Sequence, residues 1–442
     1  MRKKSLSPAR YLAGGFATMI LTGTFLLSLP FATVAGEIKL LDALFTATSA
    51  VCVTGLVVVD TGTYFTVAGQ LIIMFLILAG ALGFMTMATL IFVLLGRRIT
   101  LKDRLVIKEA LNTESIQGVV LLILAIVKMS LIIILAGSIL LGLRFIPQLG
   151  WEKGLLFSFF HAVSAFGNAG FDLFGNFQSL TGFTGDYLIS GTILTLFVLG
   201  GLGYPVILEL MQRHKKQTRF SLHTKLVLLF TSILLVVGTV VILLMEYANP
   251  ATLGGLGFAN KLFAAFFTAA TPRTAGFNVI PTDALTTPIL LFLLLLMFIG
   301  ASPASTGGGV KTTTFALLLA SVNALTKGSD EVVLYERHIP SPLILKALSV
   351  LFVSFSLIFA IIFAISIVEH KPFLALAFEV VSAFGTVGLS MGITPELGNA
   401  GRLLIVFTMF VGRIGPLTLL YALVKKFNPG GVKYPEENIL IG

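Results

Sequence analysis

Eight apolar stretches constrain the fold of this chain more than any other feature, because a helix of about 20 apolar residues can cross a lipid bilayer. They lie at residues 11–31, 67–95, 118–146, 187–211, 225–248, 286–326, 343–368 and 402–424. Only 11% of the 442 residues are charged, under half of the roughly 25% typical of soluble domains. The sequence predicts an all-α integral membrane protein with eight transmembrane helices. It excludes a disordered chain, a nucleic-acid-binding protein and a secreted disulfide scaffold.

The first apolar stretch is interpreted as a retained span rather than a cleaved signal peptide. Residues 11–31 form a run longer than the roughly 7–15 residues of a signal-peptide core, and Ala35 ends a poor cleavage motif. The single cysteine, Cys52, excludes an intrachain disulfide and a cysteine-cluster metal site.

The distribution of basic residues orients the chain in the membrane. Most of the lysines and arginines fall in every second connection, and the other connections carry the acidic residues Glu37, Asp60, Asp186 and Asp283. Cytoplasmic loops are enriched in Lys and Arg, so both termini are predicted to be cytoplasmic. The same enrichment explains the net charge of +10 without a nucleic-acid partner. The basic set is Arg2, Lys3, Lys4, Arg10, Arg97, Arg98, Lys102, Arg104, Lys108, Arg213, Lys215, Lys216, Arg219, Lys225, Lys327, Arg337, Lys346, Lys425, Lys426 and Lys433.

A glycine-bearing loop that follows a short apolar segment recurs four times, once between the spans of each successive pair. A Phe lies ten residues before each glycine, and a Leu or Phe follows it, at Gly55, Gly170, Gly276 and Gly388. A repeat of about 110 residues predicts four units of span, pore half-helix and span. The units are residues 1–105, 106–218, 219–330 and 331–442, the last including the C-terminal tail.

The second span of each unit carries two small residues three positions apart. The pairs are Gly80 and Gly83, Gly200 and Gly203, Gly300 and Pro303, and Gly412 and Gly415. Packing of helices through small residues is one interpretation of these pairs, because such contacts are common between membrane helices.

The four loops predict a path for an ion. Irregular backbone at membrane depth is tolerated only where protein buries it or water lines it. Four loops around one pseudo-four-fold axis form a ring of carbonyl oxygens that replaces the hydration shell of a cation. The half-helices direct the negative ends of their dipoles at that cation. The loops carry no acidic ring, which favours a monovalent cation held by backbone carbonyls alone. The predicted filter residues are Val53, Thr54, Gly55, Asn168, Ala169, Gly170, Thr274, Ala275, Gly276, Thr386, Val387 and Gly388.

These loops resemble the four degenerate filters of the Trk/Ktr/HKT superfamily of K+ transporters, and the chain is most similar to bacterial Ktr-type membrane subunits. The resemblance implies one pore per subunit, a homodimer in the bacterial cell membrane, and a separate cytosolic ring of RCK-type subunits that bind ATP or ADP. It implies K+ as the transported ion. Na+ is expected as an activator, and no organic cofactor is expected in this chain. In relatives, Ser in place of the first glycine accompanies Na+ transport, so Gly55 favours K+.

The sixth apolar stretch is interrupted by a run of small and polar residues. Three consecutive glycines do not support a stable lipid-facing helix. Residues 300–314 match the intramembrane gating loop of the superfamily, although a helix break without a gating role is an alternative. A phosphate-binding loop is disfavoured because Val310 separates Gly309 from Lys311. The predicted gate residues are Gly300, Ser302, Ala304, Ser305, Thr306, Gly307, Gly308, Gly309, Lys311 and Arg413.

Arg413 lies in the middle of the eighth stretch, where the other units carry Ala81, Gly201 and Ala301. A charge at this depth is costly unless it faces a cavity or a partner. We expect Arg413 to face the pore, to oppose cation flow and to hold the carbonyls of the gating loop. A purely structural arginine is the alternative.

Four further ionisable residues carry weaker expectations. Lys128 is expected to extend toward the membrane surface or to pair with Glu209. Arg273 and Glu379 are candidates to brace a filter loop from behind, although a structural role is the alternative for both. His161 is expected to be a buried, hydrogen-bonded residue rather than a metal ligand, because no second His lies near it.

The predicted function is K+ uptake through a gated filter. A membrane enzyme is disfavoured because no H-E-x-x-H motif or Ser/His/Asp set lies within the spans. A Na+-conducting or Na+/K+ symporting relative and a non-conducting regulatory subunit are the alternatives. Channel and symporter both stay open, but intramembrane carboxylates that would bind a coupling ion are scarce, which favours channel-like flux.

Overall fold

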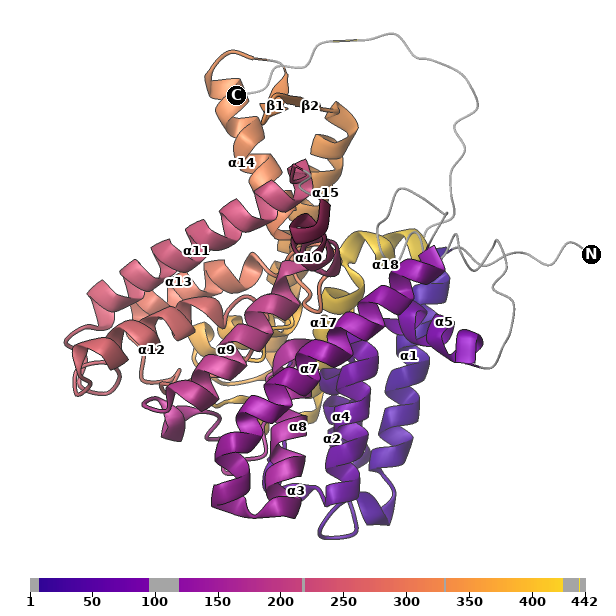
Figure 1. The fold of residues 1–442 in the computed structure, drawn as a ribbon, viewed down its shortest axis with the longest axis vertical. Helices are drawn as coiled ribbons and strands as arrows, with labels where there is room; N and C mark the ends of the chain where they lie inside the picture. Colours follow the sequence, from indigo (N-terminus) through magenta and orange to yellow (C-terminus); the bar gives the residue numbers. More distant parts are fainter. Residues whose placement is uncertain (1–7, 95–118, 217–218, 330, 424–436, 438–442) are drawn as a thin grey trace, which may run out of the picture.

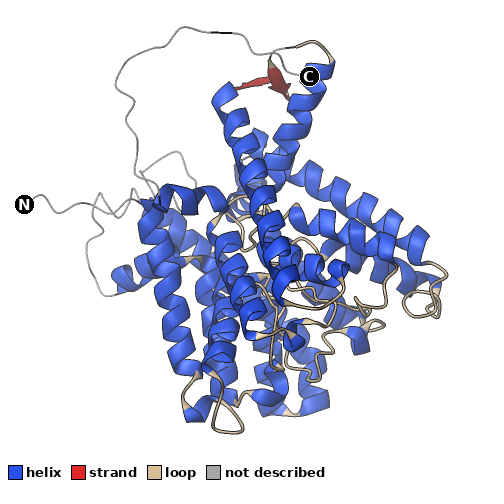
Figure 2. Cartoon of the chain, turned by 180° about the vertical axis from the view of Figure 1, so that it is seen from behind, coloured by secondary structure: helices blue, strands red, loops and turns tan. Residues whose placement is uncertain are grey.

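The computed structural model describes residues 8–94, 119–216, 219–329, 331–423 and 437. These residues are almost entirely helical, and the described strands form one small antiparallel hairpin of β1 (Val332–Leu334) and β2 (Arg337–Ile339) (Figure 2). The C-terminal tail beyond residue 423 lies outside the described residues, apart from residue 437. The following predicted cytoplasmic cations also lie outside them: Arg2, Lys3, Lys4, Arg97, Arg98, Lys102, Arg104, Lys108, Lys425, Lys426 and Lys433.

Four long helices open the four predicted units. They are α1 (Pro8–Leu27), α7 (Val119–Leu149), α11 (Leu222–Glu246) and α15 (Ser341–Val368) (Figure 1). Among the described residues, these four are long and apolar enough to cross a membrane as single helices, and one bent pair raises the number to five. The chain is therefore membrane-embedded, but helix length and composition alone do not reach the eight spans that the sequence predicts.

The second stretch of each unit is broken into two helices. Three of the breaks are single glycines at positive φ, namely Gly83 (+83°), Gly203 (+94°) and Gly415 (+92°). Glycine adopts this conformation without the steric penalty of a side chain, and it commonly ends helices. The pairs are α4 (Val67–Leu82) with α5 (Phe84–Leu94), α9 (Tyr187–Leu202) with α10 (Tyr204–Lys216), α13 (Thr287–Phe298) with α14 (Thr312–Thr326), and α17 (Asn399–Ile414) with α18 (Pro416–Leu423).

These breaks correct one expectation from the sequence, which is that only the sixth stretch is interrupted. The axes of α9 and α10 differ by 102° across Gly203. Hydropathy runs on through the breaks at Gly83, Gly203 and Gly415 because a single glycine interrupts the helix without adding a polar segment. In the first, second and fourth units the second glycine of the pair thus ends a helix, which packing through small residues does not explain.

Four short helices lie between the long and the broken helices. They are α2 (Leu40–Cys52), α8 (Trp151–Gly167), α12 (Phe258–Ala270) and α16 (Phe373–Gly385), at the positions of the four predicted half-helices. The remaining short elements are α3 (Thr61–Tyr64) and 3-10 turns at Pro30–Ala32, Thr181–Phe183 and Thr394–Glu396.

Contacts between neighbouring units close the assembly into a ring. The broken helix of each unit contacts the short helix of the next: α4 contacts α8, α9 contacts α12, α13 contacts α16, and α17 returns to α2. An ion pair between Arg402 of α17 and Asp42 of α2 joins the fourth unit to the first. Both side chains are largely buried, so this pair is shielded from solvent.

Candidate functional site

The four predicted glycine loops meet in a closed ring. Each ring glycine has a positive φ, between +68° and +93°. A Cβ added to any of them would lie under 3.0 Å from a backbone carbonyl oxygen of the next loop, a distance that real Cβ atoms essentially never show. Only glycine therefore fits both the conformation and the space. The facing carbonyls belong to Ala169 at Gly55, Ala275 at Gly170, Val387 at Gly276, and Thr54 at Gly388.

The residue two positions before each ring glycine is also left-handed, although it carries a side chain. These residues are Val53, Asn168, Thr274 and Thr386, with φ between +51° and +73°. A left-handed conformation costs a non-glycine residue roughly 1–2 kcal/mol. The same strained conformation at four equivalent positions indicates that the surrounding structure imposes it.

The short helices present their C-terminal ends to the ring. Helices α2, α8 and α16 each end three residues before their ring glycine, at Cys52, Gly167 and Gly385. Helix α12 ends earlier, at Ala270, two residues before Pro272. Unpaired carbonyls at a helix C-terminus carry a partial negative charge, which favours a cation at the centre of the ring.

Hydroxyl groups of the short helices hold the ring loops from behind, and sequence reasoning missed them. Ser49 Oγ accepts a hydrogen bond from the N–H of Gly55 at 3.0 Å, and Ser382 Oγ accepts one from Gly388 at 3.1 Å. Ser164 Oγ donates to the carbonyl of Phe171 at 2.7 Å. The signal was present in the sequence, because a serine lies four residues after the aligned Phe in these three units.

A cavity of about 380 Å³ opens on one side of the ring, and all four ring glycines line it. Asp172, Asp283, Ser390 and Thr394 also line this cavity. Asp172 is half-buried, and the pKa of its carboxyl is raised to about 7, with burial as the largest cause. The hydrogen bond from the N–H of Phe174 opposes this shift, and the nearby Asp60 carboxylate adds to it. Within the described ranges, no group of three or more His, Cys, Asp or Glu side chains is arranged to hold a metal ion.

The connection between α13 and α14 folds as a compact loop. The N–H of Gly300 donates to the carbonyl of Val310 at 2.9 Å, which closes the loop on itself. The loop packs into the break between α9 and α10, where Tyr204 N–H donates to Ala304 and Ser302 N–H donates to Gly201. Residues 299–311, called the intramembrane loop below, are therefore held by the second unit as well as their own.

Two glycines of the intramembrane loop pack against the helix side of the ring. A Cβ on Gly307 would lie under 3.0 Å from Thr274 Oγ1, and a Cβ on Gly308 would also lie under 3.0 Å from Thr386 Oγ1. Gly308 N–H also donates to Thr386 Oγ1 at 2.9 Å. Thr274 and Thr386 precede their ring glycines by two residues, so the intramembrane loop lies at the opposite end of the ring from the 380 Å³ cavity.

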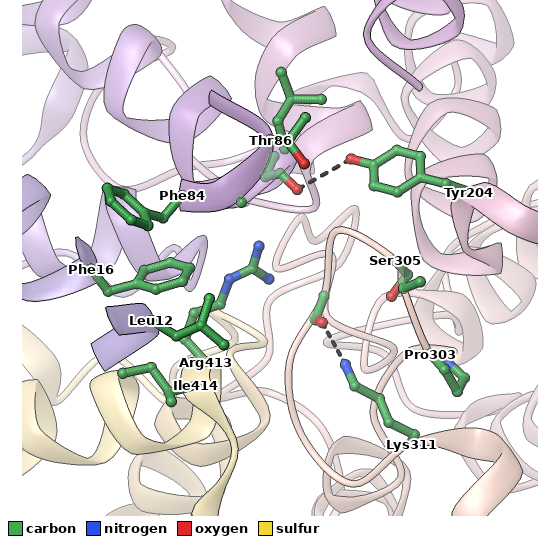
Figure 3. Close-up of a pocket in the computed structure, with 15 residues that line it drawn as sticks. Leu12, Phe16, Phe84, Thr86, Tyr204, Pro303, Ser305, Lys311, Arg413 and Ile414 are labelled. Atoms are coloured by element: carbon green, nitrogen blue, oxygen red, sulfur yellow. Dashed lines mark hydrogen bonds between the residues drawn. The ribbon is translucent and has the colours of Figure 1, made fainter. Parts of the chain in front are cut away.

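Two basic side chains donate hydrogen bonds to carbonyls of the intramembrane loop, Arg413 from outside the loop and Lys311 from within it. Arg413 donates to the carbonyl of Thr306 and to that of Gly80 on α4, and Lys311 Nζ donates to Gly307 at 2.7 Å. Both basic residues line a second cavity of about 260 Å³, and the guanidinium of Arg413 lies beside the ring of Phe16 (Figure 3). Arg413 thus contacts one carbonyl of the intramembrane loop, that of Thr306; its role in a gate stays a prediction.

The remaining predictions have mixed outcomes. His161 is completely buried and hydrogen-bonded, as expected: its Nδ1 lies 2.7 Å from the carbonyl of Phe157. The suggested pairing of Lys128 with Glu209 is wrong, because Glu209 instead accepts hydrogen bonds from Ser221 at the start of α11, while Lys128 is exposed. Arg273 is buried, and its Nε and one terminal nitrogen have no hydrogen-bond partner in the described part of the chain.

Comparisons with known proteins agree on one family. Residues 17–431 match the family model TrkH, described as a cation transport protein. The Ktr system potassium uptake protein B of Bacillus subtilis is 46% identical over 99% of this chain and 97% of its own length. The potassium/sodium uptake protein NtpJ of Enterococcus hirae is 42% identical over 100% of this chain and 98% of its own length. The crystal structure of the potassium transporter TrkH from Vibrio parahaemolyticus is similar in fold, with a TM-score of 0.73 at 17% identity over 96% of this chain and 86% of that one.

Proposed function

Because the chain belongs to the TrkH family of cation transport proteins, we propose that it takes up K+ as the membrane subunit of a Ktr-type system. Its relatives are named as cation transporters rather than enzymes, which confirms both the family and the expectation that the chain is not an enzyme. The closed ring of glycine loops is the single observation that carries the proposal.

The ring acts as the selectivity filter in this proposal. Backbone carbonyls can replace the hydration shell of K+, and the four glycines allow the carbonyls of neighbouring loops to approach one another. The units 1–105, 106–218, 219–330 and 331–442 each contribute one loop. Each broken second helix then crosses the membrane as a bent span, which gives eight spans around a pseudo-four-fold pore.

The intramembrane loop and Arg413 form the gate in this proposal, within residues 300–314. The loop covers the helix side of the ring through Gly307 and Gly308, and Arg413 holds the carbonyl of Thr306. Irregular backbone within the membrane is tolerated only where protein or water surrounds it, because its polar groups cannot face lipid. A loop that moves away from the ring would therefore stay inside the water-filled path rather than enter the lipid.

Selectivity for K+ over Na+ is proposed because all four ring positions are glycine. The Enterococcus relative is named for both potassium and sodium uptake, which makes conduction or symport of Na+ the alternative. Na+ as an activator is part of the proposal and does not follow from that name. K+ is cargo, and no organic cofactor is assigned to this chain.

The proposed assembly is a homodimer in the bacterial cell membrane with a cytosolic RCK-type ring that binds ATP or ADP. The name of the Bacillus relative refers to a Ktr system, which is consistent with a separate partner. The β1–β2 hairpin lies toward one end of the molecule and α3 toward the other, and α5, α10 and α18 lie nearer to the hairpin end than α3 does (Figure 1). We place the first of these ends in the cytoplasm, with both termini, because the basic connections follow these helices.

Growth at low K+ tests this function. A bacterium that lacks K+ uptake systems is expected to grow when it expresses this chain together with an RCK-type subunit, and to grow better when Na+ is present. Absence of growth in every combination, with the protein present in the membrane, would favour a Na+ path or a non-conducting subunit.

Protonation of Asp172 is expected to reduce K+ uptake, because its carboxyl lines the cavity through which K+ reaches the ring. The raised pKa of about 7 means that the side chain is charged above this pH and neutral below it. Uptake should therefore fall as the external pH is lowered from about 8 to about 6. Asp172→Asn should show low uptake at every pH, while Asp283→Asn, a matched control from the same cavity, should keep the pH dependence. A wild-type profile that is flat with pH would contradict this role.

A further inference from the structure

Two buried side chains occupy equivalent positions in opposite units of the ring. His161 of α8 and Glu379 of α16 each lie nine residues before their ring glycine, and both are completely buried. Each accepts a hydrogen bond from the N–H three residues after that glycine. Leu173 N–H donates to His161 Nε2 and Met391 N–H donates to Glu379 Oε1, both at 3.2 Å. The same hydrogen bond therefore joins the short helix to the segment that follows the ring glycine in the second and the fourth units. This segment is called the outer segment of the loop.

Glu379 makes two more bonds to the outer segment of its loop. Ser390 Oγ donates to Oε1 at 2.5 Å, and Thr394 Oγ1 donates to Oε2 at 2.7 Å. Ser390 and Thr394 also line the 380 Å³ cavity above the ring. Both carboxylate oxygens are thus occupied by donors from one segment, residues 390–394. A buried polar network in which every member has a partner rigidifies the structure around it.

The other two units have no such bond among the described residues. The equivalent positions hold Thr46 of α2, whose buried Oγ1 has no hydrogen-bond partner, and Phe267 of α12, which has no polar side-chain atom. The braced loops are the second and the fourth, which lie opposite each other in the ring because the units are arranged in chain order.

We propose that Glu379 is a positioning residue that sets the selectivity of the ring by fixing the outer segment of the fourth loop. His161, a neutral side chain, does the same for the second loop, so the shared function is hydrogen-bond acceptance rather than charge. Carbonyls that are held apart favour the larger K+ ion, whereas carbonyls that are free to move also accommodate Na+. The inference rests on the proposed K+ conduction, and it adds a residue outside the ring to the determinants of selectivity.

Three variants of the full chain test the inference through the ratio of K+ to Na+ permeability in proteoliposomes. Glu379→Leu removes all three bonds and should lower the ratio about tenfold, the factor that corresponds to 1.4 kcal/mol. Glu379→Gln keeps an acceptor for Met391 and should leave the ratio within about twofold of the wild-type value, a shift of about 0.4 kcal/mol. Thr46→Val, at the equivalent position without a partner, is the matched control and should leave the ratio unchanged.

A second route covers the case in which Glu379→Leu does not fold. The double variant Ser390→Ala with Thr394→Val leaves the carboxylate in place and removes its two hydroxyl donors. It should also lower the ratio, and it should reduce the rise in melting temperature that KCl gives over NaCl, since an ion that binds only the folded protein stabilises it.

An unchanged ratio in the folded Glu379→Leu variant or in the double variant would overturn the inference, as would a loss in Glu379→Gln equal to that in Glu379→Leu. Absence of K+ flux in the wild-type protein would instead contradict the proposed function. In that case the difference in melting temperature between KCl and NaCl still decides the inference, because it measures ion binding rather than flux.

Discussion

Replacement of Gly55 by serine is expected to lower the ratio of K+ to Na+ permeability by at least about tenfold, or 1.4 kcal/mol. Gly55 has a φ of +93°, and a Cβ there would lie under 3.0 Å from the carbonyl oxygen of Ala169. Backbone atoms must therefore shift, and the carbonyl that moves belongs to the ring itself. Gly388→Ser should have a similar effect, because its Cβ would meet the carbonyl of Thr54.

Gly36→Ser separates damage to the ring from strain of the backbone. Gly36 has a comparable φ of +75°, but a Cβ there would meet no atom within 4 Å. This variant should lose some stability and keep the permeability ratio. Fluxes of K+ and Na+ through Gly55→Ser and Gly36→Ser in proteoliposomes measure the difference in permeability ratio between the two variants. Their melting temperatures check that both fold. A Gly55→Ser variant that folds and keeps the wild-type ratio would contradict the assignment of the first loop to the filter.

Replacement of Arg413 by alanine is expected to raise K+ flux about tenfold in the absence of any regulatory partner. The guanidinium donates to Thr306 in the intramembrane loop and to Gly80 on α4, so its removal frees the loop from the fourth unit and breaks the link through Arg413 to the first. A hydrogen bond that involves a charged group contributes roughly 1.5–3 kcal/mol, which is enough for a tenfold change in the open population. Deletion of residues 304–309 should raise flux as well, because it removes the part of the loop that covers the ring.

Two further variants distinguish a tether from a charge barrier. Arg413→Lys keeps the positive charge but not the planar fork that reaches two carbonyls, so flux should rise if the arginine acts as a tether. Lys128→Ala removes an exposed charge from α7 and is the matched control, with flux unchanged. A folded Arg413→Ala variant without any flux would show that the arginine is structural.

The ring could be predicted from sequence because its signal repeats. One glycine loop after an apolar segment would be ambiguous, but four copies with a Phe ten residues before the glycine share one explanation. The spacing fixes which residues are equivalent, and it leaves open which loops are neighbours. The contact of Gly388 with Thr54, which closes the ring, required the structure.

The positions of the helix breaks and the hydrogen-bond partners of buried polar side chains could not be predicted from repeat spacing and hydropathy. Gly83 and Gly203 lie inside continuous apolar runs, and hydropathy does not report a positive φ. The sequence suggests Glu209 as a partner for Lys128, but Glu209 accepts a hydrogen bond from the N–H of Ser221 at the start of α11. Ser49 and Glu379 act on loop atoms that lie six and twelve residues further along the chain, so their roles depend on how each loop folds back.

Uptake of 86Rb+ by liposomes that contain the purified chain tests the central claim most directly. The wild-type chain and Arg413→Ala are measured together, with an outward K+ gradient and with external K+ or Na+ as competitor. We predict uptake above empty liposomes that is larger in Arg413→Ala and that K+ suppresses far more strongly than Na+. Absence of uptake in both proteins, or equal suppression by the two ions, would contradict a K+-selective path through the glycine ring.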